Sequence, residues 1–196
     1  MPFPYHRFFF STGFSVVPPP LGKYEPSSGT QMLEHNSSSS SVAQIGVAQL
    51  RGNPCFRFNF QGISLGCSSV DAPCVFDVTA LQWNGVNEVA QGNTRFEIAA
   101  CPDPSRCALS HRTLDPAAVG SFSNLTAINI TLVKADNLQT WWADDLQIAW
   151  ADDECAAAEC RARVPNKIMT PLPGSLASKA KRALRWAVRG PAMVRH

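Results

Sequence analysis

The stretch that decides the fold is Trp141–Trp150, which reads Trp-Trp-Ala-Asp-Asp-Leu-Gln-Ile-Ala-Trp. Successive side chains of an extended strand point to opposite faces, so this stretch predicts a strand with one largely apolar face. That face comprises Trp142, Asp144, Leu146, Ile148 and Trp150. The opposite face comprises Trp141, Ala143, Asp145, Gln147 and Ala149. The apolar face is expected to be buried.

Asp144 stands out because it lies on the predicted apolar face. An ionised carboxylate is costly to bury unless a cation or hydrogen-bond donors accompany it. In one interpretation, Asp144 and Asp145 bind Ca²⁺ through their carboxylate oxygens, with backbone carbonyls completing the shell. In the other, Asp144 caps backbone N–H groups of a turn and Asp145 is solvated. Structural Ca²⁺ is the one cofactor that the sequence indicates.

Segments of β-type sequence recur along the chain, separated by turn residues, and no segment before residue 155 predicts a helix. The expected strands are Gln44–Leu50, Cys55–Phe60, Ile63–Cys67, Val75–Trp83, Arg95–Cys101, Ala108–Thr113, Ala127–Val133 and Trp141–Trp150. Short strands at Phe8–Phe10 and Phe14–Val17 are expected to join them. This pattern predicts an all-β fold, a jelly-roll-like antiparallel β-sandwich.

Composition divides the chain into three parts. Residues 1–41 are expected to be an extended entry segment that ends in a Ser-rich, mobile loop over residues 27–41. Residues 42–160 are expected to form the sandwich core, joined by strands from residues 5–17. The chain before residue 161 carries 8 basic and 15 acidic residues, a net charge of −7, whereas residues 161–196 carry 9 basic residues and no acid. A boundary near Arg161 follows.

The basic tail contains a Pro-rich linker at residues 166–174 and then Ser175–Gly190, which can form a short amphipathic helix. We expect a detachable extension that makes weak, salt-sensitive contact with anionic surfaces. A disordered extension is the alternative interpretation.

The seven cysteines indicate disulfides rather than a metal site, since their spacings lack the C-x-x-C knuckle of structural zinc sites. Three pairs are close in sequence and would each close a short loop. They are Cys67 with Cys74, Cys101 with Cys107, and Cys155 with Cys160. Cys55 is left over, either as a free thiol or as a residue that displaces one of these pairings.

Three glycosylation sequons begin at Asn36, Asn124 and Asn129. Together with paired cysteines they indicate a secretory route and an extracellular or cell-wall location. The first residues contain no apolar run long enough for a signal peptide. Either the chain is an incomplete copy of a longer secreted protein, or this compartment is wrong.

Several segments carry a family resemblance. They are Tyr5–Phe14, Cys55–Phe60, Cys101–Cys107, Phe122–Thr126 and Trp141–Leu146. Over roughly residues 5–161 the chain resembles a family of uncharacterised secreted proteins of filamentous fungi. More broadly, Ala143–Leu146 is similar to the last strand of galactose-binding-like jelly rolls, which include many carbohydrate-binding modules. In those domains an aspartate at the position of Asp144 often belongs to a structural calcium site, whose usual partner is an acidic segment near the N-terminus. This chain starts without that segment. The resemblance implies a fold and a compartment, and no activity.

Trp83 and Trp141 are the candidates for a sugar-stacking platform, because exposed indole rings present flat apolar faces. Packing within the second sheet is the alternative for Trp141. Catalysis would need a nucleophile with a base or a pair of carboxylates. Cys55 and His111 carry no local motif, and acids such as Asp77, Glu97 and Asp115 allow a glycosidase pair without indicating one.

We therefore expect a non-enzymatic extracellular or cell-wall module with cell-wall glycan as its candidate ligand and no nucleic-acid partner. The alternatives are a glycan-active hydrolase and a purely structural or adhesion domain. The oligomeric state does not follow from the sequence.

Overall fold

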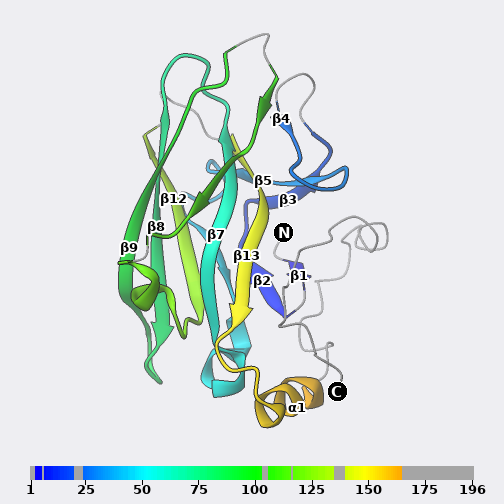
Figure 1. Ribbon diagram of the computed structural model, residues 1–196, viewed down its shortest axis with the longest axis vertical. Coiled ribbons are helices and arrows are strands. Elements are labelled where there is room, and N and C mark those ends of the chain that lie inside the picture. The colour runs from blue at the N-terminus through cyan, green and yellow to red at the C-terminus, as the bar shows by residue number, and fades with distance from the viewer. Residues whose placement is uncertain are drawn as a thin grey trace, which may run out of the picture.

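The computed structural model describes residues 3–5, 7–19, 24–102, 106–115, 117–134 and 140–164. In these residues two antiparallel sheets pack face to face, and a helix closes one end of the sandwich (Figure 1). This arrangement confirms the prediction of an all-β, jelly-roll-like fold. The predicted tail helix at Ser175–Gly190 lies outside the described residues.

The six-stranded sheet has the order β1 (Phe3–Tyr5), β2 (Phe8–Phe10), β6 (Ala43–Gly46), β12 (Ala127–Lys134), β8 (Cys74–Trp83) and β9 (Glu88–Ile98). The five-stranded sheet has the order β11 (Ser110–Thr113), β7 (Phe58–Cys67), β13 (Thr140–Trp150), β5 (Met32–Asn36) and β3 (Phe14–Val17). The strands β4 (Tyr24–Glu25) and β10 (Cys107–Ala108) form a small parallel pair. Three short 3-10 turns, η1 (Ala48–Gly52), η2 (Pro54–Phe56) and η3 (Val119–Phe122), and the helix α1 (Cys155–Arg163) complete the described elements.

The core lies between the two sheets and is rich in aromatic side chains. Strand β8 shows how the sequence builds it: Phe76, Val78 and Ala80 are fully buried, while the alternate residues Asp77 and Thr79 are only half-buried on the outer face. This alternation is the reason that Val75–Trp83 was predictable as a strand. The prediction that Asn129 and Thr131 turn outward from β12 is also confirmed, because Ile128 and Ile130 are buried on its inner face.

The region predicted as a Ser-rich loop contains a strand, so the loop prediction over residues 27–41 is wrong for its central part. Residues Met32–Asn36 form β5, which pairs with both β13 and β3. Met32, Leu33 and His35 are all buried because β5 is covered on both faces. A strand buried on both faces loses the polar–apolar alternation by which strands are recognised in a sequence.

The inward face of β13 also differs from the prediction. Its register against β7 shifts between Asp144 and Gln147, and Asp145 adopts a left-handed conformation with φ of 45°. This β-bulge adds one residue and reverses the alternation of side chains. Trp141 and Ala143 therefore face the core on one side of the bulge, and Leu146 does so on the other. Asp144 does not share a face with Leu146.

Trp142 instead belongs to a second, smaller cluster on the outside of the five-stranded sheet. It packs there with Tyr24, Met32, Cys101 and Leu109. Its indole Nε1 donates a hydrogen bond to Glu34 Oε2 at 3.1 Å. The segment with β4 and β10 thus covers this part of the outer face. Gly66 permits the cover, since a Cβ there would lie 2.7 Å from Leu109 Cδ2.

His35 is buried in the main core beside Trp141, with their ring centroids 5.1 Å apart. Burial disfavours the charged imidazolium and lowers the pKa of His35 from 6.5 to about 4. The unfolded chain takes up this proton as the pH falls through 6.5, whereas the folded chain does so only near pH 4. The free energy of unfolding should therefore decrease by about 3 kcal/mol as the pH falls from 6.5 to 4.

Urea unfolding at several pH values tests this expectation. His35→Leu should flatten the dependence between pH 6.5 and 4, whatever its stability at neutral pH. His111→Gln is the control, because it removes the same residue type from an exposed position, and its slope is compared with that of His35→Leu. An equal slope in wild type and His35→Leu would show that other groups cause the acid sensitivity.

Helix α1 is fixed to the sandwich by a disulfide and by a buried arginine. The disulfide joins Cys55 to Cys160, and Cys155 is an exposed free thiol. The predicted Cys155–Cys160 pair is therefore wrong, and the alternative in which Cys55 displaces a pairing is correct. The predicted pairs Cys67–Cys74 and Cys101–Cys107 are confirmed.

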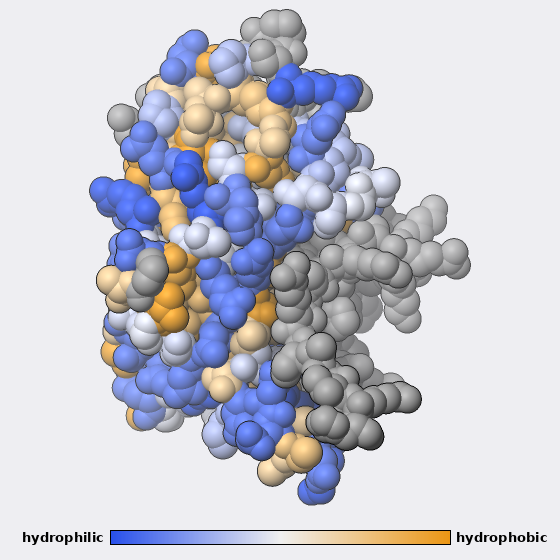
Figure 2. Space-filling model, viewed as in Figure 1, coloured by the Kyte–Doolittle hydropathy of each residue, from blue (hydrophilic) through white to orange (hydrophobic). Residues whose placement is uncertain are grey.

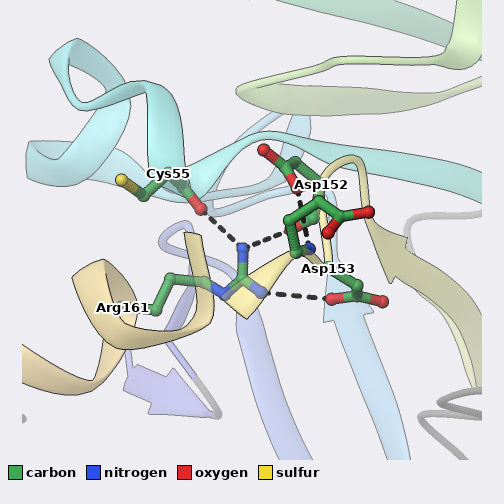
Figure 3. Close-up of polar contacts among 5 residues, drawn as sticks. Cys55, Asp152, Asp153 and Arg161 are labelled. Carbon is green, nitrogen blue, oxygen red and sulfur yellow. Dashed lines mark hydrogen bonds and ion pairs between the residues drawn. The ribbon is translucent and has the colours of Figure 1, made fainter. Parts of the chain in front are cut away.

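Arg161 is only 8% exposed although its guanidinium is charged. It donates to the carbonyl oxygens of Cys55 and Asp152 and pairs with Asp153 Oδ1 at 3.1 Å, and these contacts satisfy its buried charge (Figure 3). The guanidinium also lies 5.0 Å from the centroid of the Trp150 ring. Since α1 runs on to Arg163, the charge boundary near Arg161 falls inside a helix that is packed on the sandwich.

Candidate functional site

An open groove of about 600 Å³ lies at the edge of the sandwich where β9 and β11 approach each other. Strand β9 contributes Arg95, Phe96 and Glu97, and the chain that follows it contributes Ala99 and Ala100. The loop between β7 and β8 contributes Asp71 and Pro73, and β11 contributes Arg112. The volume falls within the range of about 300 to 1,000 Å³ that is usual for small-ligand clefts.

Both rims of the groove are held in place by covalent bonds. The Cys67–Cys74 disulfide closes the loop that carries Asp71 and Pro73. On the other rim, Ala100 is followed directly by Cys101, which forms a disulfide with Cys107. The backbone N–H of Cys101 also donates to the carbonyl oxygen of Ser69 at 2.9 Å, which joins the two rims. The groove is thus preorganised, which reduces the entropy that a ligand would lose on ordering it.

Arg112 connects the two sheets at the side of the groove. It lies opposite the core residue Ile63 on β7, so its side chain turns inward from an edge strand. Its Nη2 donates to the carbonyl oxygen of Glu97 on β9 at 2.6 Å, and its Nε is buried without a hydrogen-bond partner among the described residues. An inward arginine of this kind covers the open side of a core and discourages further strand pairing.

The remaining charges of the groove differ in how they are paired. Arg95 donates to both carboxylate oxygens of Asp77, at 2.7 and 2.9 Å, across the β8–β9 pair. This hydrogen bonding lowers the pKa of Asp77, so that carboxylate is ionised and is no general acid. Asp71 and Glu97 are exposed and form no ion pair with any described residue.

The two tryptophans predicted as sugar platforms lie away from the groove. Trp141 is 1% exposed in the main core, so its prediction as a platform is wrong. Trp83 is half-buried at the other end of β8, and the Arg51 guanidinium covers its ring at 3.9 Å from the centroid. The visible face of the molecule is largely hydrophilic, with small separate hydrophobic patches (Figure 2). Among the described residues the exposed large hydrophobic side chains are all valines.

Asp144 is 2% exposed on the outer face of the five-stranded sheet. Burial raises its pKa, and the backbone N–H groups of Asp145 and Ser28 partly oppose that shift. The Ser28 N–H lies 3.1 Å from Asp144 Oδ2. These contacts fit the interpretation of Asp144 as a cap for a turn. Within the described ranges, no three His, Cys, Asp or Glu side chains gather as they would around a metal ion.

The Ca²⁺ interpretation of Asp144 and Asp145 stays a prediction. If Asp144 holds the ion, a chelator should lower the melting temperature of the wild type, because an ion bound only to the folded state stabilises it. Asp144→Ala should lose that response and Asp145→Ala should keep it. If the melting temperature of the wild type is the same with and without chelator, the role of Asp144 is to cap backbone N–H groups.

A serine and a histidine meet on the same outer face, but they do not form a working catalytic site. Ser64 Oγ and His111 Nδ1 are 3.1 Å apart on neighbouring strands. Asp144 lies opposite Ser64 on the other side, so the carboxylate is placed beside the serine rather than behind the histidine. Ser64 is 1% exposed, so a substrate cannot reach its hydroxyl group. The Cys55–His111 pairing is excluded, because Cys55 is bonded to Cys160.

The three predicted glycosylation sites differ in accessibility. Asn36 and Asn124 are exposed, whereas Asn129 is half-buried and its Oδ1 accepts a hydrogen bond from Gln44 Nε2 at 3.2 Å. Glycosylation at these positions stays a prediction.

The family model described as "Domain of unknown function (DUF7371)" matches residues 1–161 of the chain. The chain belongs to this family. The matched region ends at the buried Arg161, within α1. The comparison with curated proteins finds no match. One similar solved structure is titled "CBM4 structure and function", with 13% identity, 72% of this chain and 73% of that chain covered, and a TM-score of 0.27. An overlap this loose carries no argument about a ligand.

Sequence reasoning missed most of the groove. Glu97 was noted only as one of several scattered acids, and Asp71, Arg95 and Arg112 were not singled out. The signal that existed was the pair Arg95 and Glu97 at alternate positions of a strand, which places two charges on one face. Their proximity to Asp71 and Arg112 depends on the pairing of strands far apart in the sequence.

Proposed function

We propose that this domain is a non-enzymatic, extracellular module that binds glycan in the groove between β9 and β11. The observation that carries the proposal is the groove itself, whose lining combines two carboxylates that are unpaired among the described residues, two arginines and small apolar residues. Carboxylates and guanidinium groups can bind neighbouring sugar hydroxyls, and flat apolar surface suits the C–H faces of a sugar ring.

The three disulfides support an oxidising compartment, because such bonds persist mainly in secreted and extracellular proteins. Among the described residues, no helix has the length and apolarity needed to cross a membrane. An extracellular or cell-wall location is therefore part of the proposal, with cell-wall glycan as the partner.

Binding to a glycan array, followed by calorimetry on the best oligosaccharide, tests the proposal. Asp71→Ala and Glu97→Ala should each weaken binding roughly tenfold, since each removes a charge-assisted hydrogen bond. Gln91→Ala is the matched control on β9, because Gln91 is exposed and lies outside the groove lining. A complete lack of glycan binding would leave a structural or adhesion domain.

The second candidate is a glycan-active hydrolase, which the presence of Asp71 and Glu97 in one groove favours. A turnover assay on each sugar that binds separates the two functions. Release of product that disappears in Glu97→Gln would make the domain an enzyme. Binding without product supports the module.

A further inference from the structure

The charged side chains of the groove, and the way in which they are paired, indicate which charge a bound glycan would carry. Four of its residues are acidic or basic: Asp71, Arg95, Glu97 and Arg112. Arg95 is bound through two nitrogens to Asp77, which lies just outside the lining. With Asp77 included, the groove carries three carboxylates and two guanidinium groups, so an anionic ligand would enter a site with net negative charge.

The charged side chains that are free to contact a ligand also favour a cationic ligand over an anionic one. Arg112 is already engaged with the carbonyl oxygen of Glu97, and its Nε is buried. Asp71 and Glu97, in contrast, are both exposed to solvent and unpaired among the described residues. The charges free to meet a ligand are therefore mainly carboxylates, and a carboxylate accepts hydrogen bonds from hydroxyl and ammonium groups but offers no donor.

From this arrangement we infer that the groove selects glycans with free amino groups, of the glucosamine type, over neutral sugars, and neutral sugars over uronates. The inference rests on the proposed glycan-binding function and specifies its ligand. Asp71 and Glu97 would each receive an ammonium or hydroxyl group, and Arg112 would fix the groove wall rather than bind an anion.

The test compares three tetrasaccharides by calorimetry at pH 6: glucosamine, N-acetylglucosamine and galacturonate. The glucosamine tetramer should bind roughly tenfold more tightly than its N-acetylated form, because two exposed ion pairs contribute modestly each. That advantage should shrink when salt is raised from about 20 to about 200 mM, since salt screens exposed charges. The galacturonate tetramer should bind weakest.

Two variants assign the preference to the groove. Asp71→Asn and Glu97→Gln keep the shape and one acceptor oxygen but remove the charge, so they should abolish the advantage of glucosamine while weakening the binding of N-acetylglucosamine much less. Glu159→Gln is the control, because Glu159 is an exposed carboxylate on α1, where it pairs with Arg163.

The outcomes separate the inference from the function. Equal affinity for all three sugars, tightest binding of galacturonate, or a glucosamine preference that persists in both amide variants would overturn the inference while glycan binding stands. Absence of binding to every tetramer and to the array would overturn the glycan-binding function, and the inference with it.

Discussion

Trp141→Ala should destabilise the domain by about 4 kcal/mol, because truncation of a large buried aromatic side chain removes its transfer free energy and leaves a cavity. The Trp141 ring is 1% exposed and meets Phe14 and Phe76 edge-on, with centroids 5.7 and 5.5 Å away. Because Phe76 belongs to the six-stranded sheet and Phe14 to the five-stranded sheet, loss of the ring would disturb both sheets. Urea unfolding followed by circular dichroism measures the change.

Trp83→Ala is the matched control for the same residue type. Trp83 is half-buried and its main described contact is the Arg51 guanidinium, an interaction worth about 1 kcal/mol or less at exposed sites. Trp141→Ala is therefore expected to destabilise the domain much more than Trp83→Ala does. The reverse order would mean that the bulge at Asp145 does not turn Trp141 inward.

Loss of the Cys55–Cys160 disulfide should have the second large effect, about 4 to 5 kcal/mol, through the entropy of the unfolded chain. The bond spans 105 residues of sequence, and a cross-link over so long a loop restricts the denatured ensemble strongly. The double variant Cys55→Ser/Cys160→Ser avoids leaving a new thiol. Its thermal and urea unfolding should show the loss, and α1 should become more sensitive to proteolysis.

Cys155→Ser is the control, since Cys155 is free and exposed. It should leave the free energy of unfolding unchanged within about 0.5 kcal/mol, as is usual for surface substitutions. Non-reducing peptide mapping of the wild type should recover Cys55 linked to Cys160. A Cys155–Cys160 peptide, or a large loss of stability in Cys155→Ser, would contradict the observed pairing.

The strands that could be predicted are those with one buried face. Val75–Trp83 and Ala127–Val133 alternate cleanly because their outer faces meet solvent, and the structure places β8 and β12 within one residue of those limits. Strand β5 was missed because both of its faces are covered, so that Met32, Leu33 and His35 are buried in succession. Burial on two faces removes the periodic signal.

Features that depend on distant contacts were not predictable. The bulge at Asp145 interrupts a stretch that reads as one continuous strand, and although aspartate is enriched among residues with positive φ, an aspartate alone does not mark the position of a bulge. Short separation correctly paired Cys67 with Cys74 and Cys101 with Cys107, but the same argument failed for Cys160, whose partner is brought near only by the fold. The groove gathers residues from β9, β11 and a loop, none of which is informative by itself.

Helix α1 and the groove lie at opposite ends of the sandwich. Arg7, next to β2, donates hydrogen bonds to the carbonyl oxygens of Val164 and Arg161, so the chain before β2 is joined to the end of α1. The β7–β8 loop, with Asp71, lies at the opposite end, because β7 runs from the η2 turn beside α1 up to Cys67. A support that holds the domain at its α1 end would therefore leave the groove, the proposed glycan site, at the end that faces away from the support.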